Sequence, residues 1–179
     1  MKNELILVDT NDKEIGYADK EEVHEKALLH RAFSVFIYTL KENEPYMLIH
    51  KRALNKYHSG GLWTNSCCSH PGKDESIEAA VSRRLKEELG ISADVKELYS
   101  FTYYHRFTAN CAEFEYDHVF IGRYDETDIP YSHDEIAEIR WISLKNLEKS
   151  IMSEPDDYTP WFMIAAPRVI EAIWREAKK

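Results

Sequence analysis

One stretch of the chain limits its fold more than any other: residues 75–89, which lie between Asp74 and Gly90. Apolar residues recur there at every fourth position and form a single stripe: Ile77, Val81, Leu85 and Leu89. This spacing is typical of an amphipathic helix with one apolar face. We therefore predict a helix over residues 75–89, with Asp74 as its N-cap and Gly90 at its C-terminal end.

Runs rich in β-branched and aromatic residues surround this helix. They predict strands over residues 4–9, 14–17, 32–40, 46–51, 95–103, 113–124 and 139–142. Further helices are predicted over 20–29, over 144–151 and from Pro160, with Thr159 as a hydroxyl N-cap. Pro167 is expected to kink this last helix or to split it in two. Strands and helices interleave without a regular βαβ rhythm, so we predict an α/β (α+β) fold with a mixed β-sheet sandwiched between α-helices.

Length, charge and cysteine content limit the partners of this chain. Its 179 residues, 44% of them hydrophobic, fit one globular domain over residues 1–179. The sequence has no apolar run near the roughly 20 residues of a membrane span, and its first residues do not resemble a signal peptide. A net charge of −9 argues against a nucleic-acid partner and requires local cations for an anionic substrate. Three cysteines, with Cys67 and Cys68 adjacent, fit a reduced cytoplasmic protein. We expect a monomer or a homodimer, a choice that the sequence does not fix.

Charged residues gather on the polar face of the predicted helix. Residues 69–91 resemble the Nudix box, G-x5-E-x7-R-E-U-x-E-E-x-G-U, at seven positions: Glu75, Arg83, Leu85, Glu87, Glu88, Gly90 and Ile91. Two positions depart from it, because Ser69 replaces the usual Gly and Arg84 replaces the usual second Glu. Clustered carboxylates suit Mg²⁺, a hard ion that commonly bridges to substrate phosphates. The alternative is an ordinary solvated helix with ion pairs between residues four apart.

A second motif precedes the box, the segment WTNSCCSHP at residues 63–71. It resembles the cysteine motif of type I isopentenyl-diphosphate isomerases, a Nudix branch that does not hydrolyse its substrate. The likeness extends over about residues 20–161 and includes residues 29–34, 51–54, 101–103, 113–115 and 158–161. It implies the Nudix fold and the isomerisation of isopentenyl diphosphate, a small isoprenoid diphosphate, to dimethylallyl diphosphate in isoprenoid biosynthesis.

The cysteine motif indicates which thiol is functional. On an extended chain Cys68 and His70 point to the same side, which favours Cys68 over Cys67 as the neighbour of His70. For Cys67 we expect the commoner fate of a free cysteine, that of a small buried hydrophobe. The resemblance implies that Cys68 is catalytic and that Glu115, with Tyr103 nearby, lies on the opposite face of the substrate. We expect Glu115 to deliver a proton and Cys68, as a thiolate, to remove one.

Two glutamates and three histidines form a candidate metal site. Glu113 and Glu115 are two residues apart on a predicted strand and share one face, which on an ordinary strand would be a solvent face. The resemblance implies that they bind one Mn²⁺ or Zn²⁺ together with His24, His30 and His70. Because His24 lies six residues before His30, one fewer than in familiar members, it is the weakest ligand unless the intervening turn absorbs the difference. We expect the remaining histidines to be structural or at the surface: His50, His58, His105, His118 and His133.

A diphosphate needs positive charge in a chain this acidic. The resemblance assigns four basic residues to it: Lys20, Arg52, Lys56 and Arg84. It also implies Mg²⁺ held by Glu88 and by the backbone near Cys68, with Glu87 assisting. The resemblance implies that the ring of Trp161 faces a carbocation formed when the substrate is protonated, a cation–π contact worth about 2 kcal/mol when desolvated. The alternative of a core aromatic is kept for Phe162 and Trp174.

Two other functions fit parts of this pattern. A Nudix hydrolase of a diphosphate is disfavoured because Arg84 cannot bind a cation and because hydrolysis does not need the cysteine motif. A Nudix module that only binds a regulatory ligand is disfavoured by the joint presence of five residues: Cys68, Tyr103, Glu113, Glu115 and Glu88.

Overall fold

The computed structural model describes residues 4–126 and 128–178. The predicted domain over residues 1–179 also includes residues 1–3, 127 and 179, which lie outside the described residues. Within the described ranges, every helix is too short or too polar to cross a membrane.

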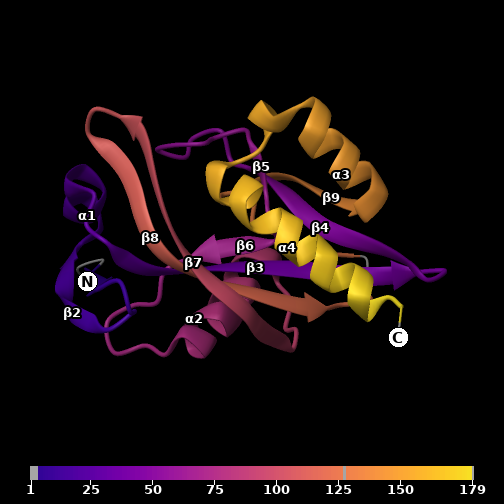
Figure 1. The fold of residues 1–179 in the computed structure, drawn as a ribbon, viewed down its shortest axis with the longest axis horizontal. Coiled ribbons are helices and arrows are strands. Elements are labelled where there is room, and N and C mark those ends of the chain that lie inside the picture. The colour runs from indigo at the N-terminus through magenta and orange to yellow at the C-terminus, as the bar shows by residue number, and fades with distance from the viewer. Residues whose placement is uncertain (1–3, 127, 179) are drawn as a thin grey trace.

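A mixed sheet of nine strands forms the centre of the described structure (Figure 1). The central strand β3 pairs in antiparallel fashion with β4 and β6 and in parallel fashion with β8, which forms a long hairpin with β7. The predicted strands are confirmed, although β7 runs beyond residue 103 because its pairing with β8 continues to Thr108 and Cys111. The strands are β1 Glu4–Val8, β2 Glu14–Asp19, β3 His30–Lys41, β4 Glu44–Arg52, β5 Trp63–Thr64, β6 Cys67–Ser69, β7 Val95–Thr108, β8 Cys111–Arg123 and β9 Ile136–Ser143.

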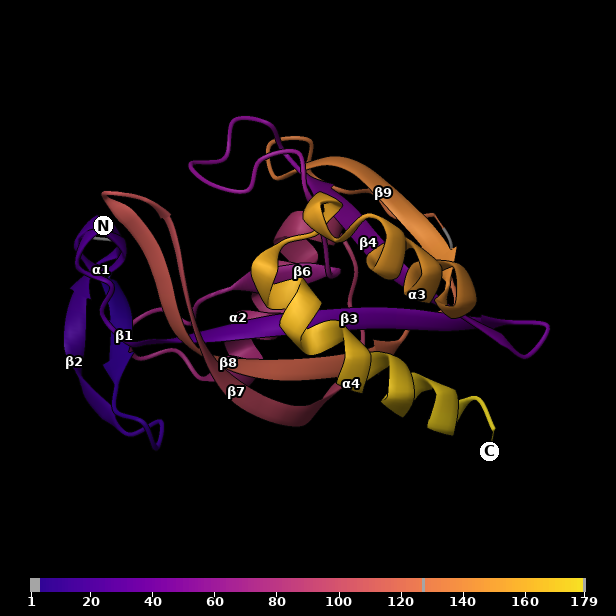
Figure 2. The same cartoon turned by 45° about the horizontal axis from the view of Figure 1, so that its top comes forward.

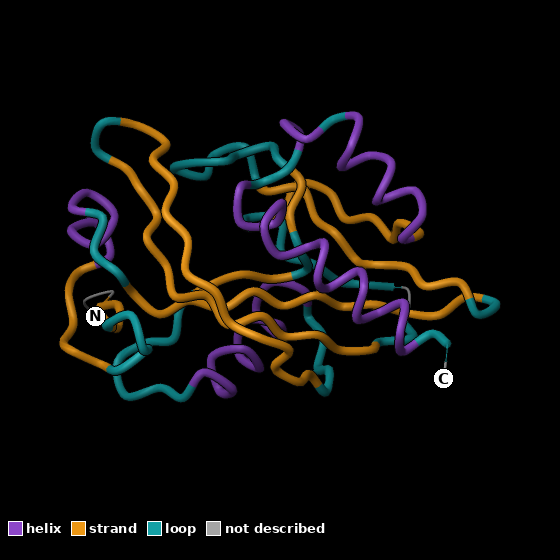
Figure 3. The backbone as a smooth tube through the Cα atoms, viewed as in Figure 1, coloured by secondary structure: helices purple, strands orange, loops and turns teal. Residues whose placement is uncertain are grey.

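Helices cover both faces of the sheet, so the predicted sandwich is confirmed (Figure 2). Helix α4 packs on one face with α3, and α2 packs on the other. The long connection between β4 and β5 is a loop (Figure 3). The helices are α1 Lys20–Lys26, α2 Ile77–Arg84, a π-helical turn η1 Leu85–Leu89, α3 Leu144–Ser153, a 3-10 turn η2 Pro155–Asp157 and α4 Pro160–Glu176.

The start of the helix predicted over residues 75–89 differs from the prediction. Helix α2 begins at Ile77, and the Ser76 hydroxyl accepts a hydrogen bond from the Ala79 amide at 3.2 Å. Asp74 is therefore not the cap, and its φ of 63° puts it in the left-handed region. The turn forms because the Glu75 carboxylate accepts the Gly72 amide at 2.8 Å.

The end of the same helix follows the prediction in part. Its last turn, Leu85–Leu89, widens to π geometry, which the fourfold apolar spacing did not predict. Gly90 ends it in the left-handed conformation, with φ of 68°, as predicted. A Cβ at Gly90 would also lie 2.9 Å from the Pro130 carbonyl oxygen, so the position has room for glycine alone.

The C-terminal helix corrects two further expectations. Of the two outcomes expected at Pro167, the split is excluded, since α4 runs unbroken over Pro160–Glu176 and buries apolar residues on both sides of the proline, while the kink stays a prediction. Thr159 has the backbone conformation of an N-cap, but its hydroxyl does not cap the helix. Instead the hydroxyl makes a hydrogen bond with the Thr64 hydroxyl at 2.9 Å.

The α4 face of the sheet changes from apolar to polar along strand β8. Val119 and Ile121 pack in the core beneath α4. The preceding alternate residues on the same side are acidic and buried: Glu113, Glu115 and Asp117. Since side chains alternate along a strand, one row of β8 passes from the core into a polar region, and the candidate site lies there.

Candidate functional site

A cavity of about 360 Å³ lies where the apolar core ends. Its walls come from strands β1, β3, β4, β6, β7 and β8, from helices α1, α2 and α4, and from loops that include residues 53–62 between β4 and β5. Ten of the predicted site residues line it: Lys20, Arg52, Lys56, Cys68, His70, Arg84, Tyr103, Glu113, Glu115 and Trp161. The other three, His24, His30 and Glu88, lie behind the wall as buried side chains.

The predicted histidines and Glu113 converge at one side of this cavity. His24, His30, His70 and Glu113 each offer one potential ligand atom, and these atoms all lie within 4.8 Å of one another. Oε2 of Glu113 is 3.1 Å from His24 Nε2 and 3.5 Å from His30 Nε2. Nε2 of His70 is 3.2 Å from Nε2 of His30.

Glu115 completes this group, which we call the His/Glu cluster (His24, His30, His70, Glu113 and Glu115). Its Oε1 lies 2.9 Å from His70 Nε2 and 3.7 Å from His30 Nε2. Its Oε2 accepts a hydrogen bond of 2.6 Å from the Tyr103 hydroxyl. Strand pairing explains the placement, because His30 of β3 is in register with Glu115 of β8, and Glu115 with Tyr103 of β7.

The His/Glu cluster has the features of a transition-metal site. His30 Nδ1 donates a hydrogen bond of 2.9 Å to the Leu28 carbonyl, which turns its Nε2 toward the cluster. His24 Nε2 and Glu113 Oε2 are buried and make no hydrogen bond within the described residues. Such orphaned groups need an explanation, and imidazole nitrogens with carboxylate oxygens suit Mn²⁺ or Zn²⁺.

The electrostatics of the cluster favour a cation. Burial disfavours a charged ring at His30, but the nearby carboxylates of Glu113 and Glu115 raise its pKa to about 9. Burial likewise opposes ionisation of Glu113, yet the histidines around it hold its pKa well below the usual range. The two carboxylates therefore demand positive charge at this point, which a bound cation supplies directly.

The spacing of His24 is absorbed by the turn after α1. Ala27 ends that helix in the left-handed conformation, with φ of 51°, and its amide donates to the Val23 carbonyl. This tight ending brings the His24 ring to 5.4 Å from the His30 ring, measured between centroids. The potential ligand atom of His24 therefore lies as near as those of the other residues, within 4.8 Å of the ligand atoms of His30, His70 and Glu113.

Cys68 and Cys67 lie on opposite sides of the short strand β6. Cys68 lines the cavity with His70, as the extended chain predicted, while Cys67 is fully buried in the core beneath α2. Burial raises the pKa of the Cys68 thiol to about 12, against a lowering effect of Arg52. This shift favours the neutral thiol, and the thiolate form of Cys68 in the reaction stays a prediction.

Glu115 and Tyr103 face the same cavity from the neighbouring hairpin. Burial and Glu113 oppose ionisation of Glu115, but its contacts with His30 and His70 lower its pKa. Burial and the adjacent Glu115 raise the pKa of Tyr103, so its hydroxyl remains a donor. The cavity is thus lined by the Cys68 side chain from β6 and by the Glu115 carboxylate from β8.

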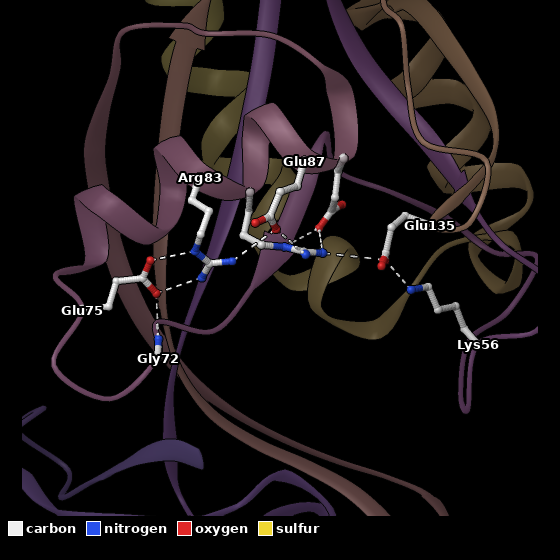
Figure 4. A network of polar contacts seen from close by, with 8 residues as sticks. Lys56, Gly72, Glu75, Arg83, Glu87 and Glu135 are labelled. Carbon is white, nitrogen blue, oxygen red and sulfur yellow. Dashed lines mark hydrogen bonds and ion pairs between the residues drawn. The ribbon is translucent and has the colours of Figure 1, made fainter. Parts of the chain in front are cut away.

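A second group of charged residues forms a network of polar contacts (Figure 4), and several of its members line the cavity. Arg83 binds both oxygens of Glu75 at 2.7 and 2.8 Å. Arg84 donates to Glu88 at 3.0 Å and to Glu87 at 2.8 Å. We call this the box network; its members are Lys56, Gly72, Glu75, Arg83, Arg84, Glu87, Glu88 and Glu135.

The box network includes one residue that sequence reasoning missed, Glu135. Its carboxylate is ion-paired with Lys56 and lies 3.7 Å from Nη2 of Arg84. Glu135 lies outside the box, in the loop before β9, so no spacing pattern pointed to it. Glu88 is only 4% exposed and is engaged by Arg84, and burial raises its pKa.

Trp161 lines the cavity, and a hydrogen bond holds its indole ring in place. Its Nε1 donates to Asn65 Oδ1 at 3.2 Å, and the Arg52 guanidinium lies 5.2 Å from the centre of its ring. Phe162 and Trp174 pack in or against the core, as expected of helix aromatics. Trp161 is therefore the aromatic residue of α4 that would contact a ligand in the cavity.

His58, expected to be structural or at the surface, is buried and contacts a residue of the His/Glu cluster. Its Nε2 lies 2.8 Å from Glu113 Oε1, and the preceding Tyr57 donates to the same oxygen at 3.2 Å. Both residues belong to the loop 53–62, which has no periodicity to reveal their contacts. His50 fits the expectation, since it is buried and bound to the Ser66 carbonyl at 3.1 Å.

Comparison with known proteins agrees with this geometry. Residues 28–162 match the NUDIX domain. Isopentenyl-diphosphate Delta-isomerase 2 of Photorhabdus laumondii is 49% identical over 88% of this chain and 87% of its own. Isopentenyl-diphosphate Delta-isomerase of Burkholderia multivorans is 43% identical over 90% of each.

Solved structures support the fold alone. A crystal structure from Deinococcus radiodurans superimposes with a TM-score of 0.67 at 18% identity, covering 84% of this chain and 90% of the other. The E. coli dihydroneopterin triphosphate pyrophosphohydrolase gives a TM-score of 0.58 at 13% identity, covering 79% and 94%. The predicted Nudix fold is thereby confirmed. From the domain match and the identities over most of its length, the chain belongs to the isopentenyl-diphosphate Delta-isomerase family of NUDIX-domain proteins.

Proposed function

We propose that this protein converts isopentenyl diphosphate to dimethylallyl diphosphate by proton transfers through Cys68 and Glu115. One observation carries the proposal. The Cys68 thiol and the hydrogen-bonded pair of Glu115 and Tyr103 line the same cavity from different strands. Family membership supports the same reaction.

The chemical step needs two groups that transfer protons. Moving the double bond requires a proton added at one carbon and another removed two carbons away. A thiol and a carboxylate in one cavity meet this need, since one donates while the other accepts. Positioned proton transfer typically contributes about 10²–10⁴-fold per group. Tyr103 holds Oε2 of Glu115 by its 2.6 Å hydrogen bond and so orients the carboxylate.

The intermediate of this reaction is a tertiary carbocation, which the cavity must tolerate. Trp161 presents an indole at the cavity wall, and its hydrogen bond to Asn65 fixes the ring. Indole is the best side chain for a cation–π contact, which is worth about 2 kcal/mol when desolvated. We therefore assign Trp161 to stabilisation of the positive charge.

The diphosphate end is assigned to the basic side of the cavity. Lys20, Arg52, Lys56 and Arg84 line it, and guanidinium groups bind phosphate oxygens in a fork. Mg²⁺ would be held by Glu88 and the backbone near Cys68, with Glu87 assisting, and would neutralise phosphate charge. Mn²⁺ or Zn²⁺ would be held by the His/Glu cluster and would act there as a Lewis acid next to Glu115.

The proposal also covers the cellular compartment and the oligomeric state of the protein. The described cysteines Cys67, Cys68 and Cys111 are all unpaired, which supports a reducing compartment and hence the cytoplasm. The proposed unit is one domain over residues 1–179, as a monomer or a homodimer. Size-exclusion chromatography with light scattering would distinguish those two states.

The direct test is to incubate the protein with isopentenyl diphosphate in deuterated water and follow the products by NMR. Dimethylallyl diphosphate should form and carry deuterium, with no stoichiometric release of phosphate or pyrophosphate. Phosphate release without the dimethylallyl product would identify a Nudix hydrolase instead. That alternative is disfavoured because Arg84 engages both Glu87 and Glu88 of the box.

A further inference from the structure

The two carboxylate oxygens of Glu113 have different surroundings. Oε2 lies among the ring nitrogens of His24 and His30, is buried, and has no hydrogen-bond partner within the described ranges. Oε1 is contacted instead by the Tyr57 hydroxyl at 3.2 Å and by Nε2 of His58 at 2.8 Å. One oxygen thus faces the proposed metal, and the other is held by the loop 53–62.

The hydrogen-bond roles at His58 follow from its partners. A carboxylate only accepts, so Nε2 of His58 donates to Glu113. In a neutral ring Nδ1 is then an acceptor, and the Ser59 hydroxyl, 3.1 Å away, donates to it. Both ring nitrogens are engaged, so His58 is not itself a metal ligand.

Packing holds the His58 ring in this orientation. It stacks on Phe107 of β7, with centroids 4.1 Å apart and planes 13° from parallel. Trp161 meets it edge-on, with centroids 5.8 Å apart. Tyr57 stacks on His24 in turn, at 5.5 Å between centroids. Since rotation of either ring would break these contacts, the donors are presented to Glu113 in fixed positions.

Glu115 has the same division between its two oxygens. Its Oε1 faces His70, and its Oε2 accepts the Tyr103 hydroxyl. Each glutamate of the cluster therefore has one oxygen directed at the histidines and one held by a donor from another part of the chain. This repetition indicates a common purpose, which is to limit each carboxylate to one metal-facing oxygen.

We propose that Tyr57 and His58 are positioning residues that hold Oε1 of Glu113, so that Glu113 binds the metal through Oε2 alone. The proposal rests on the metal site proposed for the His/Glu cluster. It also ties the loop 53–62, a wall of the substrate cavity, to that site. Partners that orient a metal ligand in this way typically contribute about 10–100-fold to metal affinity.

The test uses metal-free full-length protein titrated with Zn²⁺ in competition with a chromogenic chelator. His58→Phe keeps a ring that can stack on Phe107 but has no N–H, and it should weaken Zn²⁺ binding by about 10–100-fold. His58→Gln retains an N–H donor and should recover most of that loss. Tyr57→Phe, which removes the longer hydrogen bond, should give a smaller loss. His133→Ala, an exposed histidine in the loop before β9, is the matched control and should bind as the wild type does.

A spectroscopic measurement separates positioning from packing. The absorption spectrum of the Co²⁺-loaded His58→Phe protein should differ from that of the wild type, because Glu113 is then free to bind through both oxygens. Wild-type Zn²⁺ affinity and an unchanged Co²⁺ spectrum in His58→Phe would overturn the proposal. If His58→Phe does not fold, Tyr57→Phe decides, since its half-exposed ring is not in the core, and unchanged affinity there refutes the proposal.

The assay also distinguishes this inference from the proposed function. Wild-type protein that binds Zn²⁺ but does not isomerise isopentenyl diphosphate would contradict the function. The Zn²⁺ affinities of the variants would still decide whether Tyr57 and His58 position Glu113.

Discussion

The His/Glu cluster and the box network lie on the same cavity and are both rich in glutamate, yet they neutralise their carboxylates differently. In the box network each glutamate is paired with a permanent cation, as Glu75 is with Arg83 and Glu88 is with Arg84. In the His/Glu cluster the partners are imidazoles, and Glu113 Oε2 and His24 Nε2 have no hydrogen bond within the described residues. The glutamates are thus surrounded by imidazoles in one region and by guanidinium and ammonium groups in the other. We propose that the first region binds a metal ion and the second a diphosphate.

The difference follows from what each partner can do. A guanidinium keeps its proton and cannot bind a metal, whereas a neutral imidazole has a lone pair for one. Arginine therefore excludes a second metal from the middle of the box and favours an anion there. Histidine, buried beside two carboxylates, favours a transition metal.

The largest effect is expected at the reacting end of the cavity. Cys68→Ala should lower kcat by about 10²–10⁴-fold, because it removes one of the two proposed proton-transfer groups. Cys67→Ala is the matched control, since Cys67 is buried in the other core cluster, and it should retain most of the activity. The measurement is the initial rate of dimethylallyl diphosphate formation. An active Cys68→Ala protein would remove the thiol from the mechanism.

The second-largest effect is expected in the His/Glu cluster. Glu113→Gln should lower metal content and weaken Zn²⁺ binding by about 100-fold, the upper end of what supporting partners alone contribute. Glu115→Gln should lower both metal content and rate, because we assign it both roles. Elemental analysis of the purified proteins measures the first quantity and the NMR assay the second. A wild-type protein that is fully active without metal would contradict the assignment.

The same comparison predicts the effect of metal removal on stability. A ligand that binds only the folded state stabilises it by about 2.7 kcal/mol at a free concentration of 100 times its Kd. A chelator should therefore lower the Tm of the wild type and change that of Glu113→Gln less. Thermal unfolding followed by circular dichroism measures both shifts. Equal shifts in the two proteins would place the stabilising ion elsewhere.

The smallest effect is expected in the box network, at Arg84. Arg84→Gln should weaken the binding of pyrophosphate by about tenfold, since a hydrogen bond to a charged group contributes about 1.5–3 kcal/mol and other basic residues line the site. The measurement is isothermal titration calorimetry with pyrophosphate and Mg²⁺. Arg123→Gln, an exposed arginine outside the cavity, serves as the control. Unchanged affinity in Arg84→Gln would mean that the box network is only structural.

Short-range patterns predicted much of the candidate site. Two-residue spacing placed Cys68 with His70 and Glu113 with Glu115 on common sides, and the structure has both pairs at the cavity. The same reasoning separated Cys68 from Cys67 correctly. It failed for the helix cap, since Asp74 and Ser76 are both good caps, and the Glu75 contacts with Arg83 and Gly72 decided between them.

Short-range sequence patterns could not predict contacts between residues that are far apart in the chain. Glu135 reaches Lys56 across 79 positions, and His58 reaches Glu113 across 55. Both Glu135 and His58 lie in loops, where side-chain direction has no periodic signal. A lone histidine in a loop is indistinguishable by sequence from one at the surface until its neighbours are known.

The sequence by itself determined the alternation of faces, the apolar stripe of the box helix and, through its motifs, the family. These are local properties, set by the period of 2 in a strand and the period near 3.6 in a helix. Only the tertiary structure decided that His30, Glu115 and Tyr103 share one register across β3, β8 and β7. Register depends on which distant strands pair, and the tertiary packing also brought the loop 53–62 to Glu113, so the oxygen of Glu113 that the loop holds is decided by the fold.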